Sequence, residues 1–217
     1  MLAVLVGGSY LLGKKYDLYI FDLDGTIIDS HDLMKKCIGQ CYRIVDKDPD
    51  FDLFFSMMGD SIINIFNKLD LPLELITLYK KISDENINEI KVFQDTLKVI
   101  EFLANENKII TIYTGKDWQR AKKILSYLEI DHYFDYILTS DKVEYPKPDP
   151  QGIFQIIKKF DVSPSKTLFI GDSAYDVYSS NAAKIDSVLV TWKKSMGQVQ
   201  QLKPKYICST PLELFKC

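Results

Sequence analysis

The chain has few cysteines, no internal repeat and no segment of low complexity. Its four cysteines, Cys37, Cys41, Cys208 and Cys217, are too few for a disulfide framework in 217 residues. Cys37 and Cys41 would share one helix face and are interpreted as small core residues in a reducing compartment. The net charge is −3 and the basic residues are scattered, so the sequence carries no sign of nucleic-acid binding.

The first residues contain a hydrophobic run that lacks the marks of an export signal. No positive charge precedes residues 2–13, whereas Lys14 and Lys15 follow them, and no separate cleavage motif is evident. The run is also too short to span a bilayer. We therefore expect residues 1–15 to be an N-terminal extension, no membrane role, and a cytoplasmic protein.

Hydrophobic residues make up 47% of the chain and charged residues 26%, which is the ordinary range for a globular protein. Between about residues 30 and 92 the apolar positions have helical spacing and no strand is indicated. Elsewhere, predicted strands and helices alternate, which is typical of a parallel sheet with helices on both faces. We therefore predict an α/β fold with a Rossmann-like, doubly wound parallel core, residues 16–29 and 93–217. An all-helical cap, residues 30–92, is inserted into it.

The stretch from Tyr16 to Thr26 (YDLYIFDLDGT) is an apolar run that stops at two carboxylates, a glycine and a threonine. Such a run is typical of a central strand of a parallel sheet, and ligands bind at the carboxyl edge of such sheets. Asp22 could accept a phosphoryl group as a nucleophile, and Asp24 could act as general acid and base. Gly25 permits the sharp turn, and Thr26 adds a hydroxyl group.

Polar residues also follow three later strands, at positions where a core does not need them. They are Thr114 and Gly115, Lys147, and the group Asp172, Ser173 and Asp176. Each has an ordinary explanation as a turn, a solvated loop or a helix cap. However, the carboxyl ends of parallel strands share one edge, so these groups can converge there. The convergence of all of them favours a functional site.

The residue types at this edge suit phosphoryl transfer. Asp22, Asp24 and Asp172 offer hard oxygen ligands for Mg²⁺. Thr114 and Gly115, at a predicted helix start, offer a hydroxyl and free N–H groups to a phosphate. Lys147 can offset the negative charge that accumulates when the nucleophile meets the phosphate.

These motifs resemble the four motifs of the haloacid dehalogenase-like (HAD) hydrolase superfamily. The matching residues are Asp22-Leu23-Asp24-Gly25-Thr26, Thr114, Lys147-Pro148 and Gly171-Asp172-Ser173-Ala174-Tyr175-Asp176. The helical insert resembles the cap of the subgroup that contains phosphoglycolate phosphatases, PpaX-type pyrophosphatases and β-phosphoglucomutases. Ala183-Lys184-Ile185 stands where the family usually has alanine, glycine and a hydrophobic residue, so that helix is expected to end differently.

The resemblance implies a role for each of these residues. Asp22 would be the nucleophile and Asp24 the general acid and base. Thr114, Gly115 and Lys147 would contact the substrate phosphate. Mg²⁺ would be held by Asp22, the backbone carbonyl of Asp24 and Asp172, with Asp176, Thr26 and Ser173 in supporting positions.

The expected function is therefore a Mg²⁺-dependent phosphatase that acts on a small phosphorylated metabolite through an aspartyl-phosphate on Asp22. A phosphomutase of the β-phosphoglucomutase type would use the same residues and is the first alternative. A non-catalytic module with a phosphorylatable aspartate is the second, although the helical insert and the acid at Asp24 argue against it. The sequence does not specify the leaving group or the oligomeric state.

Overall fold

The computed structural model describes residues 15–192 and 202–216. The predicted N-terminal extension, residues 1–15, lies outside this range except for its last residue. No helix in the described part of the chain has both the length and the apolarity that a membrane span requires.

The core is a six-stranded parallel sheet with the order β5-β4-β1-β6-β7-β8. The strands are β1 (Leu18–Phe21), β4 (Ile109–Thr114), β5 (Tyr136–Thr139), β6 (Thr167–Gly171), β7 (Asp186–Val190) and β8 (Tyr206–Cys208). The chain extends from β1 to one edge and then returns to build the other edge. This reversal places a crevice at the carboxyl end of β1, between β4 and β6.

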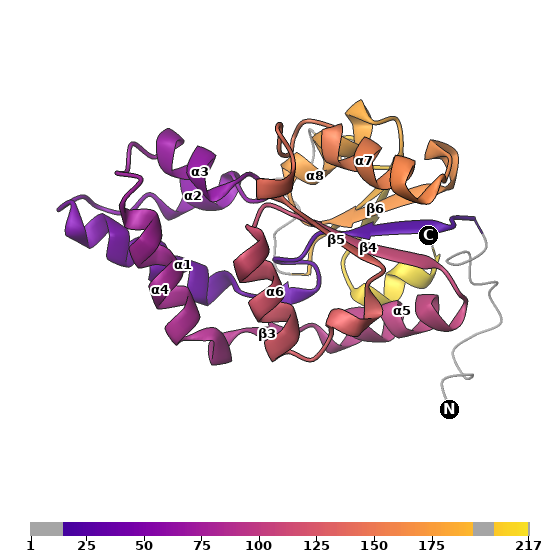
Figure 1. The fold of residues 1–217 in the computed structure, drawn as a ribbon, viewed down its shortest axis with the longest axis horizontal. Helices are drawn as coiled ribbons and strands as arrows, with labels where there is room; N and C mark the ends of the chain where they lie inside the picture. Colours follow the sequence, from indigo (N-terminus) through magenta and orange to yellow (C-terminus); the bar gives the residue numbers. More distant parts are fainter. Residues whose placement is uncertain (1–14, 193–201, 217) are drawn as a thin grey trace.

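Helices cover both faces of the sheet, because its strands are apolar on both sides. Tyr19 and Phe21 of β1 belong to the core cluster under α5 (Gln94–Asn105) and α6 (Trp118–Tyr127). Leu18 and Ile20 point the other way and pack with α7 (Gln151–Phe160). Figure 1 shows α7 and α8 (Ala174–Ala182) above the sheet and α5 below it. The predicted doubly wound α/β fold is confirmed.

Short 3₁₀ segments complete the core. They are η2 (Asp131–Tyr133), η3 (Ser140–Lys142), η4 (Pro164–Lys166) and η6 (Pro211–Lys216). Segments of three residues are too short to show a periodicity in the sequence. The six-residue segment η6 is the last element of the described chain.

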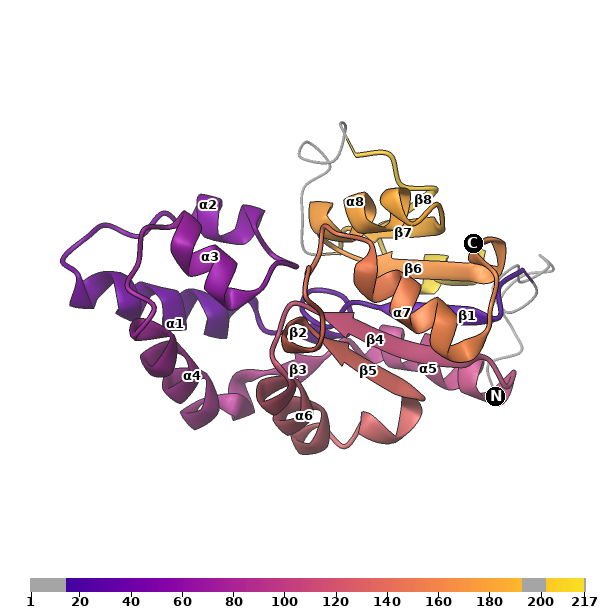
Figure 2. The same cartoon turned by 45° about the horizontal axis from the view of Figure 1, so that its top comes forward.

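A helical segment, residues 31–89, lies beyond the carboxyl end of the sheet and is called the helical insert below (Figure 2). It contains α1 (His31–Ile44), α2 (Phe51–Ser56), α3 (Ile62–Lys68), α4 (Leu75–Glu85) and η1 (Ile87–Glu89). The buried side chains of α1 recur at three- and four-residue spacing, which gives the helix one apolar face. Phe54, Phe66 and Tyr79 are buried in the centre of the insert.

Two short strands join the insert to the core. β2 (Ile28–Asp29) and β3 (Lys91–Val92) pair antiparallel, so the chain enters and leaves the insert side by side. The prediction that residues 30–92 contain no strand is therefore wrong at Lys91–Val92. A strand of two residues has no periodicity to detect, and only its pairing with β2, far away in the sequence, defines it.

Helix α8 ends in a backbone conformation that glycine adopts most readily. Lys184 has a φ of 57°, in the left-handed region, and its side chain is exposed. Its N–H donates to the carbonyl of Asn181 at 3.1 Å, and the N–H of Ile185 donates to the carbonyl of Ser180 at 3.1 Å. The side chain at position 184 therefore strains the backbone without a contact to compensate it.

We expect Lys184→Gly to raise the free energy of unfolding by about 0.5–1 kcal/mol. The relief of left-handed strain, about 1–2 kcal/mol, exceeds the added freedom of the unfolded chain, about 0.4–1 kcal/mol. Urea unfolding curves of the two proteins measure the difference. Lys184→Ala keeps a Cβ and is the control, with a change below about 0.5 kcal/mol; equal stabilisation by alanine would contradict the explanation.

Candidate active site

Asp22 is the first residue after β1, and the sheet itself orients it. Its N–H donates to the carbonyl of Ile170 at 2.8 Å, so the hydrogen-bond ladder between β1 and β6 continues one residue beyond the strand. The residue is only 3% exposed. The carboxylate therefore lies at the crevice in a fixed direction, with little contact to water.

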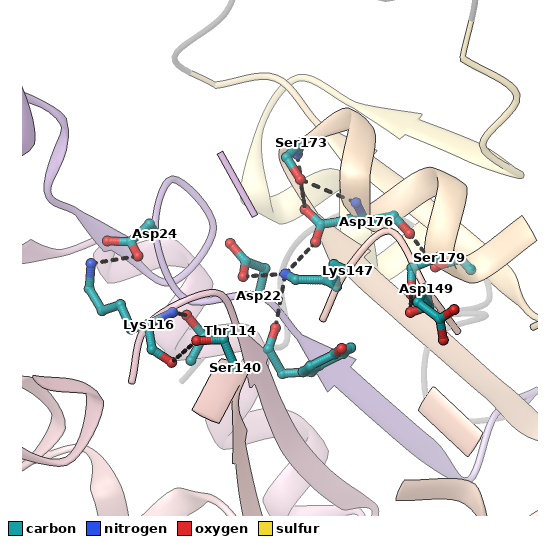
Figure 3. A network of polar contacts seen from close by, with 12 residues as sticks. Asp22, Asp24, Thr114, Lys116, Ser140, Lys147, Asp149, Ser173, Asp176 and Ser179 are labelled. Carbon is teal, nitrogen blue, oxygen red and sulfur yellow. Dashed lines mark hydrogen bonds and ion pairs between the residues drawn. The ribbon is translucent and has the colours of Figure 1, made fainter. Parts of the chain in front are cut away.

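Lys147 joins three parts of the core at this point. Its Nζ donates to Asp22 Oδ1 at 2.8 Å, to Asp176 Oδ1 at 2.6 Å and to the carbonyl of Tyr113 at 3.1 Å (Figure 3). The side chain is buried. Burial lowers the pKa of Lys147, but Asp176 and Asp22 outweigh that effect and hold it above its ordinary value. The ammonium group is therefore charged and fully occupied by protein oxygens.

Asp176 divides its two oxygens between the helix cap and the acid cluster. Ser173 caps α8: its N–H and Oγ donate to Asp176 Oδ2 at 3.0 and 2.7 Å, and it accepts from the N–H of Asp176. The other oxygen, Oδ1, accepts from Lys147. Asp176 thus forms the cap that the sequence allowed, but it is buried rather than placed on an exposed first turn, and it also reaches the candidate site.

Three carboxylates meet next to Lys147. One oxygen each from Asp22, Asp172 and Asp176 lie within 4.8 Å of one another. Gly25 has a φ of +74°, and a Cβ at that position would overlap with the carboxylate of Asp172, so glycine allows the close approach. Burial raises the pKa of Asp22, and Asp176 and Asp172 raise it further against the opposing effect of Lys147.

This cluster suits a divalent cation. Three acidic groups share one ammonium group, and the excess negative charge in a buried place is what a metal ion offsets. Carboxylate oxygens are the ligands that Mg²⁺ prefers. The predicted ligands Asp22 and Asp172 are brought together, and Asp176 joins them.

Asp24 lies on the other side of the crevice, and its carboxylate is turned away from the cluster. Lys116 Nζ contacts Asp24 Oδ2 at 2.7 Å (Figure 3). Ser30 Oγ donates to Asp24 Oδ1. Burial raises the pKa of Asp24, but Lys116 outweighs it and holds the pKa below its usual value. Lys116 was not among the predicted site residues. Its position directly after Thr114 and Gly115 could have indicated that it lies near the site.

The residues predicted to bind phosphate are at the same edge. Thr114 is buried at the end of β4, and its Oγ1 accepts from the N–H of Lys116 at 3.2 Å. Gly115 follows it and lies against the backbone of Gly59 and Asp60 in the helical insert. The hydroxyl of Thr26 is buried without a partner among the described residues, whereas its carbonyl accepts from Thr96 Oγ1 at 3.2 Å.

The helical insert closes over this edge. A Cβ on Gly115 would overlap with the carbonyl of Asp60, and one on Gly59 would lie 2.7 Å from Ser173 Oγ. Between insert and core remains a cavity of about 30 Å³, lined by Asp22, Asp24 and Lys116 among others. That volume holds about two water molecules. The space beside Asp22 is therefore smaller than a phosphate ester in this arrangement of insert and core.

An acid cluster, a buried lysine and a second carboxylate at one edge of the sheet are suited to transferring a phosphoryl group, and the chain is an enzyme of the phosphatase class. A model of the haloacid dehalogenase-like hydrolase family matches residues 19–190. The chain therefore belongs to that family, as the motifs predicted, and to its phosphoglycolate phosphatase and PpaX-like subgroup.

Individual relatives agree with this placement. The chain is 28% identical over 201 residues to pyrophosphatase PpaX of Bacillus mycoides (strain KBAB4), covering 89% of this chain and 92% of the relative. The structure of a haloacid dehalogenase-like hydrolase from Bacteroides fragilis is similar with a TM-score of 0.80, 26% identity and coverage of 90% and 98%. A predicted phosphoglycolate phosphatase from Haemophilus somnus 129PT shares the fold, with a TM-score of 0.78, 22% identity and coverage of 93% and 97%.

Lys147→Met should destabilise the protein in a pH-dependent way. The substitution leaves Asp22 and Asp176 buried without their cation, which costs about 3–5 kcal/mol when both are ionised. Burial raises the pKa of Asp22 above the unfolded value of about 4, and the variant loses the opposing effect of Lys147. The folded state is consequently least penalised at low pH, and the loss grows as pH rises through the folded pKa.

Urea unfolding at pH 5 and pH 8, in the presence of a chelator, measures this effect. The difference between Lys147→Met and the unmodified protein should be larger at pH 8. Lys158→Met, which removes an exposed lysine of α7, is the control and should change little at either pH. A loss of equal size at both pH values would show that the two carboxylates do not depend on Lys147.

Proposed function

We propose that this chain is a Mg²⁺-dependent phosphatase that hydrolyses a small phosphorylated metabolite in the cytoplasm through an aspartyl-phosphate on Asp22. One observation carries the proposal: Asp22 and Asp24 line the same small cavity, while Lys147 contacts Asp22 from the buried side. The names of the relatives, a pyrophosphatase and a phosphoglycolate phosphatase, support a small phosphorylated substrate. The buried thiols of Cys37 and Cys41, which form no disulfide, fit a reducing compartment.

In the first step, a carboxylate oxygen of Asp22 attacks phosphorus, and the bond from phosphorus to the leaving oxygen breaks. Asp24 gives a proton to the leaving oxygen. In the second step Asp24 takes a proton from water, which attacks the aspartyl-phosphate and releases orthophosphate, restoring Asp22. Lys116 contacts Asp24 in the closed arrangement, so it must turn aside before Asp24 can carry a proton to the substrate.

The remaining residues hold the phosphoryl group. The Thr114 hydroxyl and the N–H of Gly115 would donate to its oxygens, and Lys147 would balance its charge near Asp22. Asp22, the carbonyl of Asp24 and Asp172 would hold Mg²⁺, with Asp176 behind them, positioned by Ser173. The metal, when bound, neutralises charge on the phosphoryl oxygens.

We infer that the helical insert is a cap, with residues 30–92 moving against a core made of 16–29 and 93–217. Lys68 supports the closed position, since its Nζ donates to Asp60 Oδ2 at 2.8 Å within the insert and to the Tyr175 hydroxyl of the core at 3.0 Å. Closure excludes water from the attacking carboxylate. Opening through the paired strands β2 and β3 admits the substrate.

Asp22→Asn should reduce orthophosphate release by about a thousandfold or more, because an amide cannot act as the nucleophile. The test is a panel of phosphate esters and pyrophosphate, assayed with and without Mg²⁺. Asp48→Asn, at an exposed loop of the insert, is the matched control and should keep full activity. Circular dichroism should show the same fold in all three proteins.

Three results would contradict the phosphatase. Full turnover in Asp22→Asn would remove the nucleophile assignment. Isomerisation of a sugar phosphate without release of orthophosphate would indicate the phosphomutase. A long-lived phosphorylated Asp22 with no turnover would indicate a signalling module.

Asp172→Asn should weaken Mg²⁺ binding at least tenfold, because it removes one charged oxygen ligand from the cluster. Calorimetric titration of the protein with MgCl₂ measures the affinity directly. In parallel, Mg²⁺ at a hundred times its dissociation constant should stabilise the unmodified protein by about 2.7 kcal/mol. Asp48→Asn again serves as control; equal Mg²⁺ affinity in Asp172→Asn would exclude this carboxylate as a ligand.

A further inference from the structure

Arg120 is one of two arginines in the chain, and it is the buried one. It lies in the first turn of α6, is 6% exposed and points toward the helical insert. Its Nη2 donates to Ser83 Oγ of α4 at 3.2 Å, and its guanidinium carbon lies 5.0 Å from the centre of the Tyr79 ring. A core residue thus reaches across into the insert.

The charge of Arg120 is incompletely satisfied. Its Nε has no hydrogen-bond partner, and no carboxylate in residues 15–192 or 202–216 forms an ion pair with the guanidinium group. An arginine does not lose its proton in a protein, so this charge cannot be removed by titration. A buried charge without a counter-ion is costly, which is a reason to expect an anionic partner from outside the chain.

Arg120 lines the same cavity as the two catalytic candidates. Lys116, which is also 6% exposed, lies there too, so two buried cations face the space beside Asp22 and Asp24. Lys116 has Asp24 as its ion-pair partner, and Asp22 is already paired with Lys147. Asp22 and Asp24 therefore have other ion-pair partners, and Arg120 forms no ion pair within 15–192 and 202–216, although it bonds to Ser83.

The opposite wall of the cavity does not supply an anion to Arg120. Its side chains from the insert are mostly apolar, among them Met34, Phe54, Ile62 and Ile65, and its one carboxylate, Asp60, accepts from Lys68. Such a wall offers few hydrogen bonds to the hydroxyl groups of a sugar. With the phosphoryl group at Asp22, the part of the substrate that leaves must extend between these apolar side chains and the two cations.

We propose that Arg120, together with Lys116, binds a negatively charged group on the leaving part of the substrate. Preferred substrates then carry a carboxylate or a second phosphate close to the phosphorus that Asp22 attacks. This inference rests on the proposed function. The anion also offers Lys116 a partner other than Asp24, which releases Asp24 to meet the leaving oxygen.

Matched substrates test the proposal. Phosphoglycolate is compared with 2-hydroxyethyl phosphate, and pyrophosphate with methyl phosphate, so each pair differs mainly in the charge of the leaving group. Arg120→Met should lower kcat/KM on the order of 100-fold for the preferred anionic substrate, as loss of one member of a buried charge pair does. For the neutral member of the pair, kcat/KM should change by less than about threefold. Arg120→Lys keeps the charge but not the paired donors. Its kcat/KM for the anionic substrate should lie between those of the unmodified protein and Arg120→Met.

Arg43→Met is the control, because Arg43 is the other arginine and lies exposed on α1. Arg43→Met should leave kcat/KM unchanged for both the anionic and the neutral member of each pair. An equal effect of Arg120→Met on charged and neutral substrates would overturn the proposal, since it would indicate a purely structural role. The proposal also fails if the unmodified enzyme shows no preference for the anionic member of either pair.

A binding measurement separates this inference from the proposed function. Imidodiphosphate and orthophosphate are titrated calorimetrically into Asp22→Asn and into Asp22→Asn with Arg120→Lys or Arg120→Met. Imidodiphosphate affinity should fall about tenfold or more with each Arg120 substitution, while orthophosphate affinity stays the same. Unchanged imidodiphosphate affinity rejects the role of Arg120. Absence of phosphate release from every ester by the unmodified protein rejects the phosphatase instead, and leaves the binding result to decide the anion site.

Discussion

The contact of the Lys147 ammonium group with two buried carboxylates is the interaction on which the rest of the site depends. It ties the end of β1 to the first turn of α8 and, through the carbonyl of Tyr113, to β4. None of these groups could be buried alone at acceptable cost. Together they hold Asp22 in one direction while leaving an excess of negative charge, and that excess makes a divalent cation a natural further component.

The sequence predicted the parts of the fold that depend on local pattern. The apolar run before Asp22, the turn at Gly25 and the polar residues after later strands are local features, and parallel-sheet geometry alone brings them together. The sequence did not predict that Lys116 and Arg120 lie at the site. Such side chains are normally exposed, and here they are buried where the insert meets the core. Lys184 illustrates the same limit: its left-handed conformation is imposed by packing on both sides of a helix end, against the preference of its own side chain.

The helical insert has two physical tasks that depend on each other. In the proposed mechanism, its apolar side chains exclude water from the carboxylate of Asp22, and its closure buries the charges of Lys116 and Arg120. Exclusion of water strengthens every charge interaction inside, so closure around an anionic substrate is favourable where closure around a neutral one is not. Selection of the substrate and assembly of the reacting groups are in this way the same event.

The insert and core meet closely at two glycines: Gly115 lies against the main chain of Gly59 and Asp60, and Gly59 lies against the side chains of Ser173 and Tyr175. A contact of this kind depends on the absence of a Cβ at each glycine, so it does not change when the apolar side chains lining the cavity are replaced. The enzyme can therefore acquire a new substrate by exchanging side chains such as Met34 or Ile65 while its closing motion stays intact. Only a Cβ at one of the two glycines would wedge this contact open for every substrate at once.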